Sequence, residues 1–271
     1  MHLLYCDESN LEERAGDFLI YGGLMIDSET ALQLSAKIDE LRADLGVPGD
    51  YRLKFNPGPD TFSHEQFIQL KTSILALAQE HDVKLLAYVI LHDIATDPDT
   101  ARRNGINTVC YHFDCALNRT KSPGLVLIDR FNDEGNEIDA HLREKFMIGL
   151  KEMPYAKEMR LQRIVGFHYS SIGQSHFPSM TDVVLGSLRF AINAHSRNQE
   201  QHLNTANQLL RSIAPMLWRE DGNDRVSEIG FLFSPKIIKA DKYREKYEGL
   251  KNFLAAQGIE TEQIITDERT Y

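Results

Sequence analysis

The stretch Leu125-Val126-Leu127-Ile128-Asp129 decides the fold class of this chain. It consists of four apolar residues that follow the turn-forming pair Pro123-Gly124 and end in a carboxylate. A short apolar run bounded by turn residues is typical of a strand buried in the centre of a sheet. The stretch from Val83 to Leu91 is a second run of this kind. Because strands buried on both faces need helices to cover them, these two runs predict an α/β protein.

The rest of the chain alternates between strands and amphipathic helices. Strands are expected at residues 3–6, 18–26, 83–91, 125–129, 161–169 and 226–233. Helices, marked by apolar residues at helical spacing, are expected at residues 28–45, 63–78, 100–118, 137–151, 178–192 and 202–218, with a last helix after residue 235. No internal repeat or flexible linker divides the sequence. We therefore expect a single domain over residues 1–271, a mixed β-sheet flanked by helices, with a C-terminal helical extension at about residues 235–271.

The composition is that of a globular, cytoplasmic protein. Of the 271 residues, 42% are hydrophobic and 26% are charged, values that exclude a disordered chain. Charged residues appear near the start, and no apolar run reaches the roughly 18 residues of a membrane helix. The three cysteines, Cys6, Cys110 and Cys115, are too few for a disulfide framework and lack zinc-site spacing. The sequence thus predicts a cytoplasmic protein with reduced thiols and no membrane contact.

Charge is unevenly distributed along the chain. The net charge of −10 argues against indiscriminate binding to nucleic acid. The first 60 residues hold twelve acidic and five basic side chains, a surplus that bound cations would neutralise. In contrast, the stretch from Lys236 to Lys251 holds six basic and three acidic residues. That stretch could face phosphates, although mixed charge of this kind is more often the solvated face of a helix.

Three aspartates stand where carboxylates could meet. Asp7 and Asp129 each end an apolar strand, and Asp182 lies in the first turns of an apolar helix. If the two strands are neighbours, both carboxylates project at the same edge of the sheet, where α/β proteins place their sites. Singly, each residue has an ordinary structural explanation, such as the helix dipole for Asp182. Together they provide the oxygen ligands that Mg²⁺ prefers, and two such ions could activate water and stabilise a leaving oxygen.

The opening hexapeptide Tyr5-Cys6-Asp7-Glu8-Ser9-Asn10 resembles the Tyr-x-Asp-Glu-Ser-Gly opening of the bacterial domain-of-unknown-function 3800 family, which is placed among ribonuclease-H-like folds. The hexapeptide is the specific part of the resemblance. Further similarities follow in the same order at Gly22-Gly23, Leu53-Lys54, Val126-Leu127-Ile128-Asp129, Ser179-Met180-Thr181-Asp182-Val183-Val184-Leu185-Gly186 and Ser234-Pro235-Lys236. The resemblance therefore spans most of the chain.

The resemblance implies a ribonuclease-H-like fold and a metal-dependent nuclease. By this similarity Asp7, Asp129 and Asp182 would form a metal-binding triad for two Mg²⁺ or Mn²⁺ ions, with Glu8 and Lys54 as accessory residues. Genes of this family tend to accompany mobile elements and phage defence, so the resemblance also implies a role of that kind. The expected substrate is nucleic acid, either RNA or DNA. Phosphate contacts are expected from Lys54 and from three lysines of the last helix, Lys236, Lys239 and Lys242.

Some positions depart from the family pattern. Asn10 stands in place of the usual Gly, which is tolerable because Asn also accepts left-handed backbone angles. Ser179 and Thr181 replace Gln and Ala, so no role of that Gln can be carried over. Glu8 would point away from Asp7 wherever the strand continues, because a strand alternates its faces.

Other enzyme classes have less support. The ten histidines show no His-x-x-x-His pair, and only their position near Asp182 draws attention to His168 and His176. A nucleophile elbow, a Walker loop and a dinucleotide fingerprint are absent from the sequence. An aspartyl-phosphate phosphatase needs a second aspartate where Ser9 stands. The remaining alternative is a non-catalytic ribonuclease-H-like module that binds a protein partner or nucleic acid.

Overall fold

A six-stranded mixed sheet forms the centre of the protein. The computed structural model describes residues 1–130, 137–147, 149–153 and 156–268. The strands of the sheet are β1 (His2–Ser9), β2 (Phe18–Asp27), β3 (Lys84–Leu91), β4 (Gly124–Asp129), β7 (Ile164–Ser170) and β8 (Phe231–Ser234). Their order is β7-β4-β1-β2-β3-β8. Only β2 is antiparallel to its neighbours, so the other five strands point the same way.

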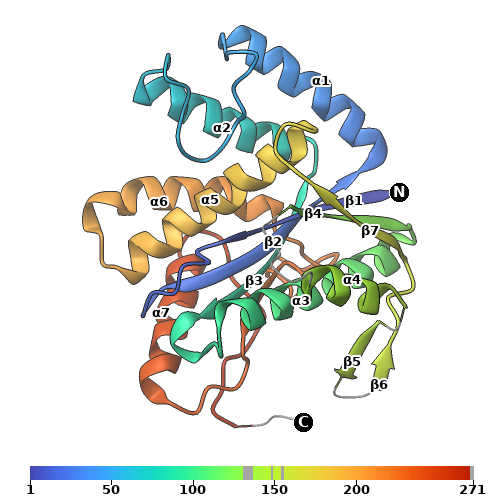
Figure 1. Cartoon of the computed structure of the whole chain (residues 1–271). Coiled ribbons are helices and arrows are strands. Elements are labelled where there is room, and N and C mark those ends of the chain that lie inside the picture. Colours follow the sequence, from blue (N-terminus) through green and yellow to red (C-terminus); the bar gives the residue numbers. More distant parts are fainter. Residues whose placement is uncertain (131–136, 148, 154–155, 269–271) are drawn as a thin grey trace.

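Helices cover both faces of this sheet. The helices are α1 (Ser28–Asp44), α2 (His64–Glu80), α3 (Pro98–Thr120), α4 (Glu137–Met147), α5 (His176–Ser196), α6 (Glu200–Ile213) and α7 (Asp241–Ala255). Figure 1 shows α1, α2, α5 and α6 on one side and α3 and α4 on the other. Each side has its own apolar core. The α/β class and the helix-flanked mixed sheet predicted from the sequence are confirmed, as one compact domain.

The alternation of β1 decides which side chains face which core. Leu3 and Tyr5 pack on the side of α5, whereas Leu4 and Cys6 pack on the side of α3. The aromatic rings of Tyr5 and Phe177 lie 5.2 Å apart, which fixes α5 along β1. By the same alternation, the side chain after Cys6 returns to the α5 side. This matters because that residue is an aspartate.

Several elements differ from the expected ones. β1 continues past Asp7, because Glu8 and Ser9 still pair with β2. The expected strand at 226–233 is formed only at its end, as β8. α6 ends at Ile213, since Pro215 lacks the N–H that would continue the helix. A small hairpin of β5 (Leu150–Met153) and β6 (Ala156–Met159) replaces the end of the helix expected at 137–151 and was not foreseen.

The C-terminal segment packs into the main core. α7 buries Tyr247, Leu250 and Leu254 in the same apolar cluster as α5. The Tyr247 hydroxyl donates to Ser234 O at 2.6 Å and accepts from Leu91 N at 2.8 Å, so it joins α7 to the ends of β8 and β3. Within the described residues, no helix has the length and apolar character needed to cross a membrane.

Candidate functional site

Asp7 and Asp129 lie side by side on two central strands. β1 and β4 are parallel, and their register places Cys6 opposite Ile128, so the next residue on each strand is an aspartate. Adjacent strands are about 4.8 Å apart, and aligned residues of parallel strands point to the same face. That face is the one covered by α5. The structure therefore brings both carboxylates to the carboxyl ends of neighbouring strands, the usual location of sites in α/β proteins.

Asp182 reaches the same region from α5. The neighbouring Thr181 approaches the backbone of β1, with its Oγ1 3.4 Å from Tyr5 O. One oxygen of Asp182, Oδ2, accepts a 2.6 Å hydrogen bond from the backbone N–H of Phe55. The position of Asp182 is therefore fixed both by its helix and by the loop that carries Phe55. Its charge raises the pKa of both Asp7 and Asp129.

Burial and mutual repulsion raise the pKa of two of these carboxyls. Burial raises the pKa of Asp7 well above its usual range, and the charges of Glu8, Asp129 and Asp182 raise it further. The pKa of Asp129 is also raised, first by burial and then by Asp182. A hydrogen bond from its neighbour's backbone and the charge of Lys54 partly offset this effect on Asp129. The cluster is thus short of positive charge, the condition under which a cation binds favourably.

The donor atoms of the cluster are carboxylate oxygens, the type of ligand that a hard divalent cation prefers. Among the described residues, no group of three or more His, Cys, Asp or Glu side chains is already arranged to hold a metal ion. Mg²⁺, however, commonly binds through one or two carboxylates, with water and substrate phosphate as its other ligands. Asp7 and Asp129 can supply that pair. Asp182, already hydrogen-bonded through Oδ2, has its other oxygen available.

Ser170 is a residue of this site that sequence analysis missed. The β4–β7 register pairs it with Asp129, on the same face. It is only 5% exposed, and its hydroxyl has no hydrogen-bond partner among the described residues. Buried hydroxyls without a partner are rare, and one beside a carboxylate can hold a ligand or a water. No sequence pattern marks this serine, because the pairing of β4 with β7 sets its position.

Glu8 lies on the opposite face of the sheet. Because β1 continues through this residue, its side chain turns toward α3, where Oε1 is 3.6 Å from the Arg102 guanidinium. Burial raises the pKa of Glu8, while Arg102 lowers it. Glu8 is connected to the cluster by its backbone, since its N–H donates to Asp7 Oδ1 at 2.8 Å. The structure does not bring its carboxylate together with the three aspartates.

Of the four lysines expected to contact phosphates, Lys54 lies near the cluster. It is exposed, next to Phe55, and its charge lowers the pKa of Asp129. The expectation that the other three lie on the last helix is wrong for two of them, Lys236 and Lys239. They precede α7, because the chain pairs with Thr266 before the helix begins. All three follow β8, which is three strands from β1, about 14 Å across the sheet.

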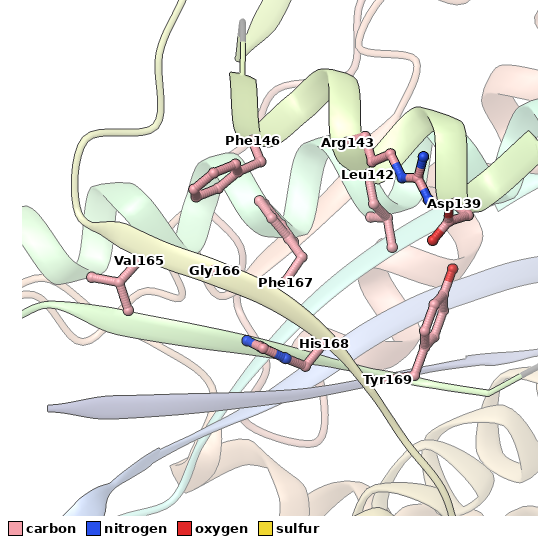
Figure 2. Close-up of a pocket in the computed structure, with 9 residues that line it drawn as sticks. All are labelled: Asp139, Leu142, Arg143, Phe146, Val165, Gly166, Phe167, His168 and Tyr169. Atoms are coloured by element: carbon pink, nitrogen blue, oxygen red, sulfur yellow. Dashed lines mark ion pairs between the residues drawn. The ribbon is translucent and has the colours of Figure 1, made fainter.

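His168 and His176, the two histidines near Asp182 in sequence, have different neighbours in the structure. His176 begins α5 and its Nε2 is 2.8 Å from Asp39 Oδ1 on α1, so it joins two helices. His168 aligns with Leu127 of β4 and lies on the edge strand β7, next to Gly166. A separate hollow of about 320 Å³ lies between β7 and α4. Figure 2 shows Phe167 and Tyr169 pointing toward α4, with His168 directed away from it.

Comparisons with known proteins give no relative from which a function could be transferred: no family model, no curated protein and no solved structure matches the chain.

Proposed function

We propose that this chain is a divalent-metal-dependent phosphodiesterase that acts on nucleic acid, with a ribonuclease-H-like fold. One observation carries the proposal: Asp7 and Asp129 stand at aligned positions of two parallel central strands, on the face covered by the helix of Asp182. The raised pKa values of Asp7 and Asp129 and the unpartnered hydroxyl of Ser170 support a site that a cation completes. The similarity of the opening hexapeptide to the domain-of-unknown-function 3800 family supports the same activity.

In this mechanism the chain supplies position and charge. Asp7 and Asp129 would hold Mg²⁺ or Mn²⁺, and Asp182 would complete the site from α5. A divalent ion at that place lowers the pKa of water and offsets the charge that develops on a leaving oxygen. Lys54, which already acts on Asp129, would attract the phosphate as a point charge. The hydrogen bond from Phe55 N holds Asp182 in one orientation before substrate arrives.

The test is a panel of single-stranded, double-stranded and hybrid RNA and DNA substrates, each incubated with Mg²⁺ and with Mn²⁺. We expect cleavage of at least one substrate by the wild type and its loss in Asp129→Asn, which keeps the shape of the side chain but removes an anionic ligand. Asp60→Asn, at an exposed position whose charge does not contribute to the pKa shift of Asp7 or Asp129, is the matched control and should cleave like the wild type.

A non-catalytic module that binds a protein or nucleic acid is the second candidate. It is favoured by the absence, in the described part of the chain, of three acidic or imidazole side chains already arranged for a metal. If no substrate in the panel is cut and Asp129→Asn and Asp60→Asn bind nucleic acid equally well, the phosphodiesterase proposal is wrong and this candidate replaces it.

A further inference from the structure

A polar cavity lies between the end of β1 and the second half of α5. Its volume is about 310 Å³, within the lower range of small-ligand sites. The cavity is lined by Asn10, Arg189, Phe190, Asn193, Arg197 and Gln199. These residues come from the end of β1, the second half of α5 and the turn before α6. The lining has two guanidinium groups and no carboxylate, in a chain whose net charge is −10.

The two arginines have different partners. Arg197 forms an ion pair with the buried Asp17, with Nε 3.0 Å from Oδ1 and Nη2 2.5 Å from Oδ2, so its charge is compensated. Arg189 is half-buried and has neither an ion pair nor a hydrogen bond within the described residues. Its guanidinium carbon lies 5.7 Å from the centre of the Phe55 ring. Arg189 therefore carries an uncompensated charge in a partly enclosed place, where an anion is the favoured partner.

Two asparagines form a rigid wall of the cavity. The amide of Asn193 donates to Asn10 Oδ1 at 3.1 Å and accepts from Asn10 Nδ2 at 2.7 Å. Asn10 Nδ2 also donates to Phe18 O at 3.0 Å, which uses both of its N–H groups. A primary amide has two N–H groups, so one of those on Asn193 remains available. A guanidinium and an amide N–H thus converge on the cavity as donors.

The cavity lies beyond Asp182 along α5 and beyond Asp7 along β1. Arg189 follows Asp182 by seven residues, two turns of α5, which places it on the same helix face about 10 Å further along. Asn10 follows Asp7 by three residues, at most about 10 Å along the chain. The contact between Asn10 and Asn193 shows that β1 and α5 progress in the same direction. Both estimates place the near end of the cavity about 10 Å from the cluster.

We propose that this cavity binds a backbone phosphate of the nucleic-acid strand, in a nucleotide beyond the one held at the aspartates. This inference rests on the function proposed above and adds the direction of the strand, along α5 from Asp182 toward Asn193. The guanidinium of Arg189 donates two parallel hydrogen bonds to the phosphate oxygens, a geometry that lysine cannot provide. The free N–H of Asn193 donates a third. The cavity contact fixes the strand in register without reading its bases.

Binding of a fluorescein-labelled 12-nucleotide single strand, as RNA and as DNA, tests the inference by fluorescence anisotropy in EDTA, where no cleavage occurs. Arg189→Ala should raise the Kd about tenfold, the loss of one charge-assisted contact, and lower the salt dependence of log K by about one unit. Arg189→Lys should recover only part of the affinity. The control Arg211→Ala, on the exposed face of α6, should match the wild type.

Oligonucleotides with one neutral methylphosphonate linkage locate the contact. If the phosphate that contacts Arg189 is the one made neutral, the wild type and Arg189→Ala should bind that oligonucleotide with the same Kd. Neutral linkages at the other positions should leave the difference in Kd between the two proteins unchanged. If Arg189→Ala and Arg211→Ala bind alike, or if no linkage has this effect, the cavity is not a phosphate site.

The effect of Mn²⁺ on the melting temperature distinguishes failure of this inference from failure of the proposed function. Mn²⁺ should raise the melting temperature of the wild type and of Arg189→Ala equally. If Mn²⁺ stabilises both but Arg189→Ala binds the strand normally, the cavity inference alone fails. If Arg189→Ala loses affinity but Mn²⁺ stabilises neither protein, the phosphate contact stands and the metal-dependent activity falls.

Discussion

The ionised side chain of Asp7 is unfavourable in the folded protein. It lies on a buried strand, on the same face as two further aspartates, and its pKa is raised first by burial and then by its acidic neighbours. Such a residue costs stability when it is ionised, and the hydrogen bond from Glu8 N offsets only part of that cost. Costs of this kind occur where a group is kept for function, because selection for stability alone would remove it.

A pH-dependent loss of stability follows for the metal-free protein. Above about pH 4 the unfolded Asp7 ionises, whereas the folded one keeps its proton until the raised pKa is reached. The folded state binds more protons in that window, so stability falls as pH rises through it and stays low above it. Asp7→Asn removes this term. We expect it to raise the free energy of unfolding at pH 8 by about 1 kcal/mol, a typical stabilising substitution.

Urea unfolding in EDTA at pH 5 and at pH 8 measures this difference. The difference in the free energy of unfolding between Asp7→Asn and the wild type should be larger at pH 8 than at pH 5. Asp60→Asn should have the same free energy of unfolding as the wild type at both pH values. An equal gap at both pH values would mean that Asp7 has an ordinary pKa.

At the scale of elements, α5 and the loop that carries Phe55 form a unit. Gly186 allows the loop to approach: a Cβ at this position would lie 2.4 Å from Cγ of the Phe55 ring. The same loop donates the N–H that holds Asp182. Lys71 Nζ lies 4.4 Å from the centre of the Phe55 ring and donates to Phe55 O at 3.4 Å. The loop is thus held in place by packing on a helical glycine.

Gly186→Ala should displace this loop. Alanine in a helix normally stabilises by up to about 1 kcal/mol relative to glycine, but overpacking costs about 1–3 kcal/mol, so we expect a net loss. Gly249→Ala in α7 is the control, because its Cβ would meet the nearest atom at 3.7 Å, and it should be neutral or stabilising. Chemical denaturation measures both. If Gly186→Ala is as stable as Gly249→Ala, the loop does not depend on this approach.

The elements also show what the sequence could predict. The runs 83–91 and 125–129 are strands nearly as expected, because a buried strand leaves an unbroken apolar run. The placement of Asp7 and Asp129 beside each other required that β1 and β4 be neighbours, which the sequence only permitted. Ser170 and Arg189 were missed, since their roles depend on strand pairing and on a cavity between distant segments. Periodicity predicts elements, whereas long-range pairing determines sites.

At the scale of the whole molecule, the C-terminal segment completes the fold. Tyr247 is fully buried and its hydroxyl bonds to Leu91 N and Ser234 O. Tyr247→Phe leaves a buried N–H without its partner, so we expect a loss of about 1–3 kcal/mol in the free energy of unfolding. Tyr243→Phe, on the same helix, should change it by less than about 0.5 kcal/mol. Two separate unfolding transitions in the wild type would show that this segment folds on its own.

The charged residues of the proposed site gather near one edge of the central sheet. Asp7 and Asp129 lie side by side near the carboxyl ends of β1 and β4, Lys54 lies nearby, and Arg189 lies two helical turns beyond Asp182. A cation at the aspartates would make this edge attractive to a polyanion that the net charge of −10 otherwise repels. Metal binding is therefore central to the proposed function, in which both substrate attraction and catalysis would depend on it.

Anomalous diffraction from crystals soaked in Mn²⁺ tests that claim most directly. We expect an anomalous peak about 2.1 Å from carboxylate oxygens of both Asp7 and Asp129, and no such peak in crystals of Asp129→Asn soaked in the same way. Well-ordered wild-type crystals that show manganese only at other places, or at none, would contradict the account.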